Sequence, residues 1–207
     1  MIRILGRANA INVRKILWLA EELGMAYDQE DWGRGYRATS EQEFLKINPF
    51  GKIPVLCDGD AVVRESNTIL RYLVRKAGRD DLYPTDIVGA AGVEFWMDWA
   101  STDLYTGARP AFLGLALKYP GFQDPRMIET GIYEWTREMR SLDRHLATNG
   151  PYLYANRFTL ADIPVGLIVN RWFRTDFSKP PLAAVSSYYE LLSERPAYKL
   201  HGRNGLP

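Results

Sequence analysis

The sequence predicts a chain of two parts: an α/β domain over residues 1–77 and an all-α helical domain over residues 87–207. The first part alternates short β-branched runs with stretches of helical apolar spacing, which is typical of a β-α-β layout. The second part keeps helical spacing to its end. Residues 78–86, which contain glycine and proline, are expected to form a linker between the two.

Composition narrows the classes of protein to which the chain can belong. A length of 207 residues, with 46% hydrophobic and 25% charged residues, is ordinary for one large globular domain or two small ones. The 26 basic and 25 acidic residues nearly cancel, so we expect no nucleic-acid partner. No apolar run approaches the roughly 18 residues that span a bilayer, and residues 1–5 turn polar too soon for a signal peptide. We therefore expect a cytoplasmic protein with no membrane partner.

The chain has few of the side chains that usually carry catalysis or bind metals. Cys57 is the one cysteine, and the two histidines show no spacing typical of a zinc site. We expect no metal, a structural role for Cys57, and a reactive group that arrives with a ligand.

The first β-α-β unit is predicted from strands at residues 2–5 and 27–32. Between them, apolar residues at i, i+3, i+4 and i+7 predict a helix over residues 12–23. Asn12 is expected to be its N-cap and Gly24 its stop. The order of these elements predicts a parallel pair of strands with a right-handed crossover.

A polar loop then leads to a short helix at residues 41–46 and to a β-hairpin. The hairpin strands are expected at residues 55–57 and 61–63, joined by the turn Asp58-Gly59-Asp60. Glu65 and Ser66 are expected to start the next helix.

Four helical stretches are expected beyond the linker. Residues 87–119 are predicted to form one long helix or two, broken near Pro110, and residues 126–146 to form another. Thr159 to Asp162 suit a capping box that starts an apolar helix ending at Trp172. Residues 183–192 are expected to form the last helix.

Two features between residues 48 and 66 suit the binding of a small peptide. A cis bond between Ile53 and Pro54 would leave the backbone groups of Ile53 free to pair with an extended peptide. At the predicted helix start, Ser66 suits a carboxylate and Glu65 suits an α-amino group. The alternatives are an ordinary trans proline and a plain helix cap.

The motifs resemble, in order and spacing, those of the glutathione S-transferase family. The resemblance runs from residue 2 to about 198 and rests on Asn12-Val13-Arg14-Lys15, Asn48-Pro49 through Val55-Leu56, Glu65-Ser66, Phe158 through Ile163, and Glu194 through Tyr198. It implies a thioredoxin-like N-terminal domain, an all-helical C-terminal domain and a homodimer, closest to a theta-like or nu-like bacterial branch.

The resemblance also implies glutathione as a co-substrate. Its implied contacts are with Lys52, Ile53, Pro54, Glu65 and Ser66, and with Asp98 of the partner subunit. Arg37 and Lys46 are weaker candidates for the role of Lys52, which is to bind the glycine carboxylate.

The group that would activate the glutathione sulfur departs from the family pattern. The loop from Gly6 to Asn12 holds no serine, tyrosine or cysteine, and Ala10 occupies the usual serine position. Asn12 is the first candidate donor and Asn9 the second. Lowering a thiol pKa from about 8.5 by about two units needs roughly 2.7 kcal/mol. One hydrogen bond to a charged group supplies roughly 1.5–3 kcal/mol, and a helix N-terminus adds about 0.3–1 kcal/mol, so Asn12 suffices. The alternative is that Asn12 only caps its helix.

For the second substrate, the resemblance implies an apolar site lined by Trp32, Tyr105, Arg109, Phe112 and Trp172. Arg109 would stabilise developing negative charge on this substrate. The aromatic residues have an ordinary alternative as core.

The expected function is therefore conjugation of glutathione to small hydrophobic electrophiles, as in detoxification. One alternative is glutathione-dependent reduction of disulfides or peroxides. Another is a non-catalytic glutathione-S-transferase-like binding protein, an alternative that the missing loop serine supports.

Overall fold

The computed structural model describes residues 1–205, and the chain divides into two compact units. The first unit is Met1–Asp80, and the second begins at Asp81. The division lies between the last helix of the α/β part and the first helix of the helical part.

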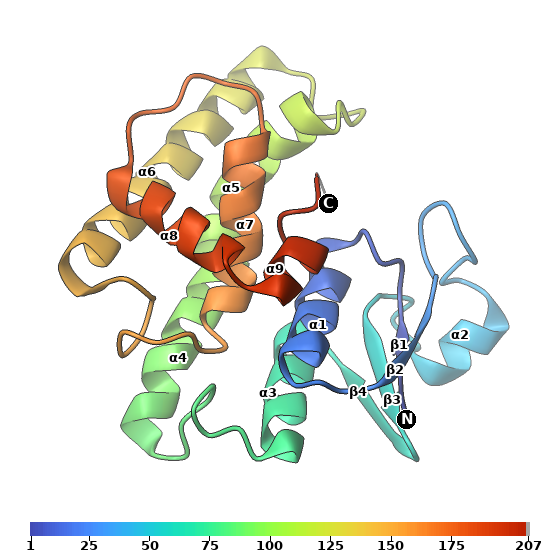
Figure 1. Cartoon of the computed structure of the whole chain (residues 1–207). Helices are drawn as coiled ribbons and strands as arrows, with labels where there is room; N and C mark the ends of the chain where they lie inside the picture. The colour runs from blue at the N-terminus through green and yellow to red at the C-terminus, as the bar shows by residue number, and fades with distance from the viewer. Residues whose placement is uncertain (206–207) are drawn as a thin grey trace. The chain divides into compact units, whose positions relative to one another are not determined.

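The first unit is built on a four-stranded mixed sheet (Figure 1). Its strands are β1 (Ile2–Leu5), β2 (Tyr27–Glu30), β3 (Val55–Asp58) and β4 (Ala61–Arg64), in the order β2-β1-β3-β4. β1 runs parallel to β2 and antiparallel to β3, and β3 and β4 form the expected hairpin. This arrangement confirms the thioredoxin-like layout.

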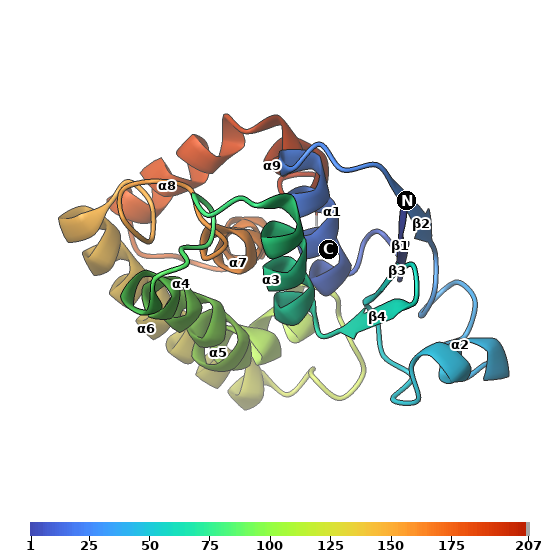
Figure 2. The ribbon, with the colours of Figure 1, turned by 90° about the horizontal axis from the view of Figure 1, so that it is seen from below.

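Helices cover both faces of this sheet. α1 (Ile11–Glu22) and α3 (Ser66–Ala77) pack on each other over one face, and α2 (Gln42–Ile47) lies over the other (Figures 1 and 2). Leu5 and Val55, which are register partners, point to the α2 face and pack with Phe44 and Trp32. Side chains alternate along a strand, so the buried neighbours of these two residues face α1 and α3.

Most elements of this unit differ from the prediction by one or two residues at an end, and β3 and β4 each run one residue further than expected. α1 begins at Ile11 because the carbonyl of Ala10 already accepts hydrogen bonds from the N–H groups of Val13 and Arg14, so Ala10 is the N-cap rather than Asn12. β2 ends at Glu30, and Trp32 forms only an isolated bridge. α2 lies one residue later than expected, at Gln42–Ile47.

The regular elements of the second unit's described residues are all helices, and its connecting loops contain one isolated bridge, between Tyr154 and Arg157. Its longest helix is α6 (Pro125–Asn149), and its central helix is α7 (Asp162–Arg174), in which residues 162–172 are all buried. α4 (Ile87–Trp99) and α8 (Ala183–Ser193) both pack on α7, and α6 packs on α8. An almost fully buried helix of this kind forms the core of a helical domain.

Pro110 does not break the helix, and that prediction was wrong. α4 continues through the π-helical segment η1 (Ala100–Leu104), α5 (Tyr105–Ala111) and a second π-helical segment, η2 (Phe112–Ala116). Pro110 lies inside α5. A proline removes one helical hydrogen bond, and the wider π turns on either side accommodate this local change in bonding.

One further helix follows the one predicted to be last. α9 (Pro196–His201) starts after Arg195 and places Pro196 at its first position, where the missing N–H has no helical partner to lose.

Half of the capping box expected for α7 is present and is deeply buried: the Asp162 carboxylate accepts from Thr159 N–H, but the N-cap of the helix is Ala161, which has no side-chain cap bond. Asp162 has no exposed surface and accepts hydrogen bonds from Thr159 N–H (2.8 Å), Thr159 O–H (3.3 Å), Leu153 N–H (3.2 Å) and Tyr188 O–H (3.0 Å). Burial raises the pKa of Asp162 to about 6, even though all four hydrogen bonds favour the carboxylate. The group is still ionised at pH 7 and ties the start of α7 to a loop and to α8.

We predict that Asp162→Ala lowers the free energy of unfolding by roughly 3–5 kcal/mol, because each buried donor left unpaired costs about 1–3 kcal/mol. Asp143→Ala is the matched control, since that carboxylate accepts one bond, from Val185 N–H at 3.0 Å, and should cost about 1 kcal/mol. Urea unfolding of both variants measures this, and equal costs would contradict the prediction.

Candidate functional site

A cavity of about 460 Å³ in the first unit is lined by most of the residues predicted to bind glutathione or to activate its sulfur. Its lining consists of Asn12, Asn48, Phe50, Lys52, Ile53, Pro54, Arg64, Glu65 and Ser66. Of the residues predicted to bind glutathione or to activate its sulfur, Asn12, Lys52, Ile53, Pro54, Glu65 and Ser66 are therefore brought together.

The register of the sheet explains why these distant segments meet. Val55, at the start of β3, pairs with Leu5 at the end of β1 and with Arg64 at the end of β4. The loop that leads into α1, the segment before β3 and the start of α3 must then emerge at one edge of the sheet.

The segment before β3 is held in place by Asn48. Its amide donates to the carbonyl of Lys52 at 2.7 Å, and its Oδ1 accepts from Phe50 N–H at 3.2 Å. The Ile53–Pro54 bond is cis, as predicted. Neither the N–H nor the C=O of Ile53 has a hydrogen-bond partner within residues 1–205, so both are available to an extended ligand.

The start of α3 forms a second wall of the cavity. Glu65 precedes the helix with φ 65°, a conformation that costs a non-glycine residue about 1–3 kcal/mol. The first amide of α3 to bond back along the helix is that of Ile69, so the N–H groups of Ser66 and Thr68 are unbonded in the described chain. Such a helix end favours a carboxylate.

Asn12 and Ser66 are in direct contact. The hydroxyl of Ser66 donates to Oδ1 of Asn12 at 3.3 Å, and Nζ of Lys15 donates to Oγ of Ser66 at 3.3 Å. Asn12 is exposed on the second residue of α1, whereas Ser66 and Lys15 are each 6% exposed. Sequence analysis did not identify Lys15 as a site residue, because its link to Ser66 spans 51 positions.

Arg64, Asn48 and Phe50 were also missed as cavity residues. Arg64 donates from Nη2 to the carbonyl of Ile47 at 2.5 Å, at the C-terminal end of α2 where a cation is favourable. The position of Arg64 directly before Glu65 was the one feature of the sequence that indicated a place for it at the cavity. With exposed Lys52, the cavity wall carries two cations and the one carboxylate of Glu65.

Three other candidates of the first unit do not line this cavity. Asn9 is exposed in the loop before α1. Arg37 bonds to Glu41 and Glu43, which raise its pKa, and its guanidinium lies 3.8 Å from the ring centroid of Trp32. Lys46 is exposed on α2. Of the three basic residues predicted to bind the glycine carboxylate, Lys52 therefore lines the cavity and Arg37 and Lys46 do not.

Three aromatic residues expected at the second-substrate site are core residues instead. Trp32 is 1% exposed and packs on Phe44 with ring centroids 5.0 Å apart. Phe112 is 2% exposed, and Trp172, which packs on Trp135, is 1% exposed. Helical or strand spacing cannot distinguish a buried aromatic ring from one that faces a cleft.

The remaining candidates of the second unit are exposed. Tyr105 is 38% exposed, and Asp98 and Arg109 are also exposed, with the Arg109 guanidinium 4.9 Å from the ring centroid of Phe122. Cys57 lies on β3 outside the cavity lining, and burial raises the pKa of its thiol, so it is not an activated nucleophile.

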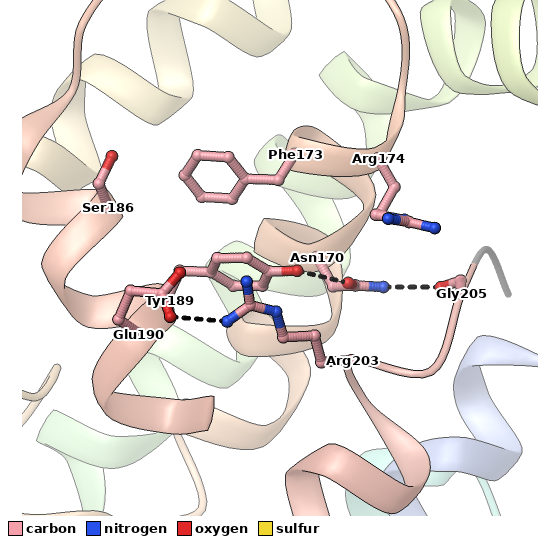
Figure 3. A pocket seen from close by; sticks show the side chains of 8 residues that line it. All are labelled: Asn170, Phe173, Arg174, Ser186, Tyr189, Glu190, Arg203 and Gly205. Carbon is pink, nitrogen blue, oxygen red and sulfur yellow. Dashed lines mark hydrogen bonds and ion pairs between the residues drawn. The ribbon is translucent and has the colours of Figure 1, made fainter. Parts of the chain in front are cut away.

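A second cavity, of about 480 Å³, lies in the helical unit (Figure 3). Its lining consists of Asn170, Phe173, Arg174, Ser186, Tyr189, Glu190, Arg203 and Gly205. Tyr189 O–H donates to Asn170 at 2.9 Å, Asn170 donates to the carbonyl of Gly205 at 3.0 Å, and Arg203 pairs with Glu190 at 2.8 Å. Since these groups bond one another and secure the segment after α9, the cavity of the first unit is the better candidate site.

Within residues 1–205, no group of three or more histidine, cysteine, aspartate or glutamate side chains is placed to hold a metal ion. In the same residues, no helix has the length and apolar character needed to cross a membrane.

Comparison with known proteins finds similar sequences and similar solved structures. A family model described as the glutathione S-transferase N-terminal domain matches residues 3–75. The chain is 32% identical over 201 residues to glutathione S-transferase GstB of Escherichia coli strain K12, and the match covers 96% of both proteins. A solved theta class glutathione S-transferase of Xanthomonas axonopodis pv. citri, with glutathione bound, is similar with a TM-score of 0.91 at 34% identity. That match covers 100% of this chain and 99% of the other.

A different kind of relative is also similar. The probable elongation factor 1-gamma 2 of Arabidopsis thaliana is 32% identical over 189 residues. The match covers 89% of this chain but 45% of that protein, so this chain spans less than half of that relative's length.

We predict that Glu65→Gly raises the free energy of unfolding by about 1 kcal/mol, because glycine tolerates positive φ and relief of strain outweighs its entropy cost. Glu65→Gln, which keeps the side-chain volume and the strain, should leave stability unchanged. The two variants are compared by urea unfolding, and a glycine variant less stable than the glutamine variant would show that the backbone at Glu65 is unstrained.

Proposed function

This chain belongs to the glutathione S-transferase family, and from that premise we propose that it binds glutathione in the cavity of the first unit and conjugates its thiolate to small hydrophobic electrophiles. The observation that carries the proposal is the meeting, on one cavity, of the unpaired backbone groups of Ile53 with the Glu65-Ser66 start of α3.

The charges of the cavity match those of glutathione, which has two carboxylates and one ammonium group. The γ-glutamyl carboxylate suits the unbonded N–H groups at the start of α3, and its ammonium suits Glu65. Lys52, with Arg64 on the same wall, suits the glycine carboxylate. The cysteinyl backbone between these two ends suits the N–H and C=O of Ile53.

In the proposed reaction, the protein supplies binding and a lowered thiol pKa, while the nucleophile is the sulfur of glutathione. The thiol proton passes to solvent, the thiolate lone pair forms the carbon–sulfur bond, and the leaving group departs with the electrons of its broken bond. Asn12 is the proposed donor to the thiolate. Its Oδ1 is occupied by Ser66, which leaves its Nδ2 hydrogens to donate, and the unbonded N–H groups at the start of α1 add to the effect.

The electrophile is proposed to contact Tyr105 and Arg109, since both are exposed, unlike the other aromatic candidates. A homodimer is proposed as well, because Val88 and Phe95, two helical turns apart on α4, are 79% and 60% exposed. Asp98 of the partner subunit would then reach the glutathione ammonium, and light scattering should give the mass of two chains. A cytoplasmic location and a role in detoxification complete the proposal.

Two alternatives have specific support. Glutathione-dependent reduction of disulfides or peroxides is favoured by the presence of asparagine, instead of serine, at the start of α1. A non-catalytic role is favoured by the similarity to an elongation factor 1-gamma and by the same missing serine.

We predict that calorimetry shows one glutathione bound per chain and that turnover with an aryl halide exceeds turnover with hydroxyethyl disulfide. Lys52→Met should weaken binding about fivefold, as expected for loss of an exposed ion pair, while Lys46→Met, outside the cavity, should leave it unchanged. Faster disulfide turnover would favour the reductase. No binding at millimolar glutathione would leave the non-catalytic alternative.

We predict that Asn12→Ala raises the pKa of the bound glutathione thiol by at least about one unit, because one hydrogen bond to the thiolate is lost. The ultraviolet absorbance of the thiolate, followed against pH, measures this. Asn9→Ala serves as the control for the second candidate, and an unchanged thiol pKa in Asn12→Ala would remove Asn12 from the role.

A further inference from the structure

Three side chains connect the starts of α1 and α3 along the cavity wall. Nζ of Lys15 lies 3.3 Å from Oγ of Ser66 and 3.4 Å from Oδ1 of Asn67. Oγ of Ser66 lies 3.3 Å from Oδ1 of Asn12. These hydrogen bonds connect the buried ammonium group of Lys15 to the exposed amide of Asn12 at the cavity. They therefore link the part of the site that suits a carboxylate to the part that suits the sulfur.

The chemistry of the three groups determines the direction of each hydrogen bond. An ammonium group can only donate, a hydroxyl donates one proton and accepts at its lone pairs, and an amide oxygen can only accept. Lys15 occupies one lone pair of Ser66 Oγ, and the hydroxyl donates its proton to Oδ1 of Asn12. Nδ2 of Asn12 is then the part of the amide that is left to face a ligand.

An asparagine amide rotated by half a turn has nearly the same shape, so shape alone does not select its orientation. Loss of the hydrogen bond from Lys15 opens both lone pairs of Ser66 Oγ and so favours acceptance from Nδ2 of Asn12. The amide would then present Oδ1 toward the ligand. A carbonyl oxygen repels a thiolate, whereas an amide N–H stabilises it, so the orientation decides whether Asn12 lowers the thiol pKa.

We propose that Lys15 is a positioning residue which, through Ser66, holds the Asn12 amide with its N–H groups toward the sulfur of glutathione. This inference rests on the proposed function, because it assigns the sulfur of glutathione to the amide end of the contacts. It goes beyond that function in naming a buried residue that controls thiol activation without touching the ligand.

Lys15 has one other route to the same effect, since a positive charge near the cavity stabilises a thiolate directly. The two routes differ in a double-mutant cycle. If Lys15 acts through Asn12, its removal has no further effect once Asn12 is alanine. If it acts by its charge alone, the effects of the two substitutions add.

The experiment measures the pKa of the bound glutathione thiol by thiolate absorbance in the wild type, Lys15→Met, Asn12→Ala and the double variant. Lys15→Met should raise the pKa by about one unit, which corresponds to a tenfold loss of thiolate at pH values below the wild-type pKa. Asn12→Ala should raise the pKa at least as much, and the double variant should match Asn12→Ala.

Lys52→Met is the matched control, because it removes a lysine from the same cavity that has no bond to Ser66 or Asn12. It should weaken glutathione binding and raise the bound-thiol pKa by less than Lys15→Met does, because it removes a positive charge from the cavity but no bond to Ser66. Should Lys15→Met fail to fold, Ser66→Ala removes the hydroxyl that links Lys15 to Asn12 and should raise the bound-thiol pKa equally. Ser66→Thr, which restores the hydroxyl, should reverse this rise.

An unchanged thiol pKa in Lys15→Met, or additive shifts in the double variant, would overturn the inference. Either result leaves the proposed function intact, because calorimetry of the wild type tests glutathione binding separately. Absence of binding to the wild type would instead remove the proposed function, and the inference with it.

Discussion

The antiparallel pairing of β1 with β3 is the constraint on which the candidate site depends. Val55 pairs on one side with Leu5 and on the other with Arg64, so β3 begins where β1 and β4 end. The segments attached to these three strand ends therefore lie at one edge of the sheet. Those segments supply Asn12, Ile53 and Ser66, whose polar groups face one cavity. A one-residue slip in this register would turn alternate side chains to the opposite face of the sheet and separate the groups.

The site combines a strained backbone at one residue with fully hydrogen-bonded side chains at others. Glu65 holds a positive φ angle, which a structure retains only where the surroundings determine it. In contrast, Asn48 satisfies both its amide groups within its own loop, and Arg64 bonds the last carbonyl of α2. The strain and the free N–H groups are thus concentrated at the start of α3, where a bound carboxylate would use them. The rest of the cavity wall is fixed by bonds that a ligand need not replace.

The second unit depends on a different buried group. Asp162 joins the start of α7 to Thr159, Leu153 and Tyr188, and burial keeps the Tyr188 hydroxyl protonated by raising its pKa. α7 is buried on every face over residues 162–172 because other helices of the unit cover it. The bond between Asp162 and Thr159 was predictable because the two residues belong to a local pattern of four residues. The continuation of the helix past Pro110 was not, since it depends on π-helical turns that leave no distinct pattern in the sequence.

Much of the site could be predicted because its sequence motifs are short and consist of neighbouring residues. Ile53-Pro54, Glu65-Ser66 and the absence of a loop serine are read directly from neighbouring residues, and the cavity contains the predicted pairs. Asn12 was a correct cavity residue with an incorrect local role, because the helix start shifted by one residue to Ile11. Spacing rules locate a helix better than they locate its first residue.

The sequence by itself determined the order of strands and helices, the peptide-binding motifs and the departure at Ala10, because each follows from the chemistry of consecutive residues. Only the tertiary structure decided that Trp32 and Phe112 belong to the core and that Lys15 reaches Ser66. Burial and contacts between residues far apart in the chain depend on how whole elements pack. Periodicity records which side of an element is apolar, but it does not record what covers that side.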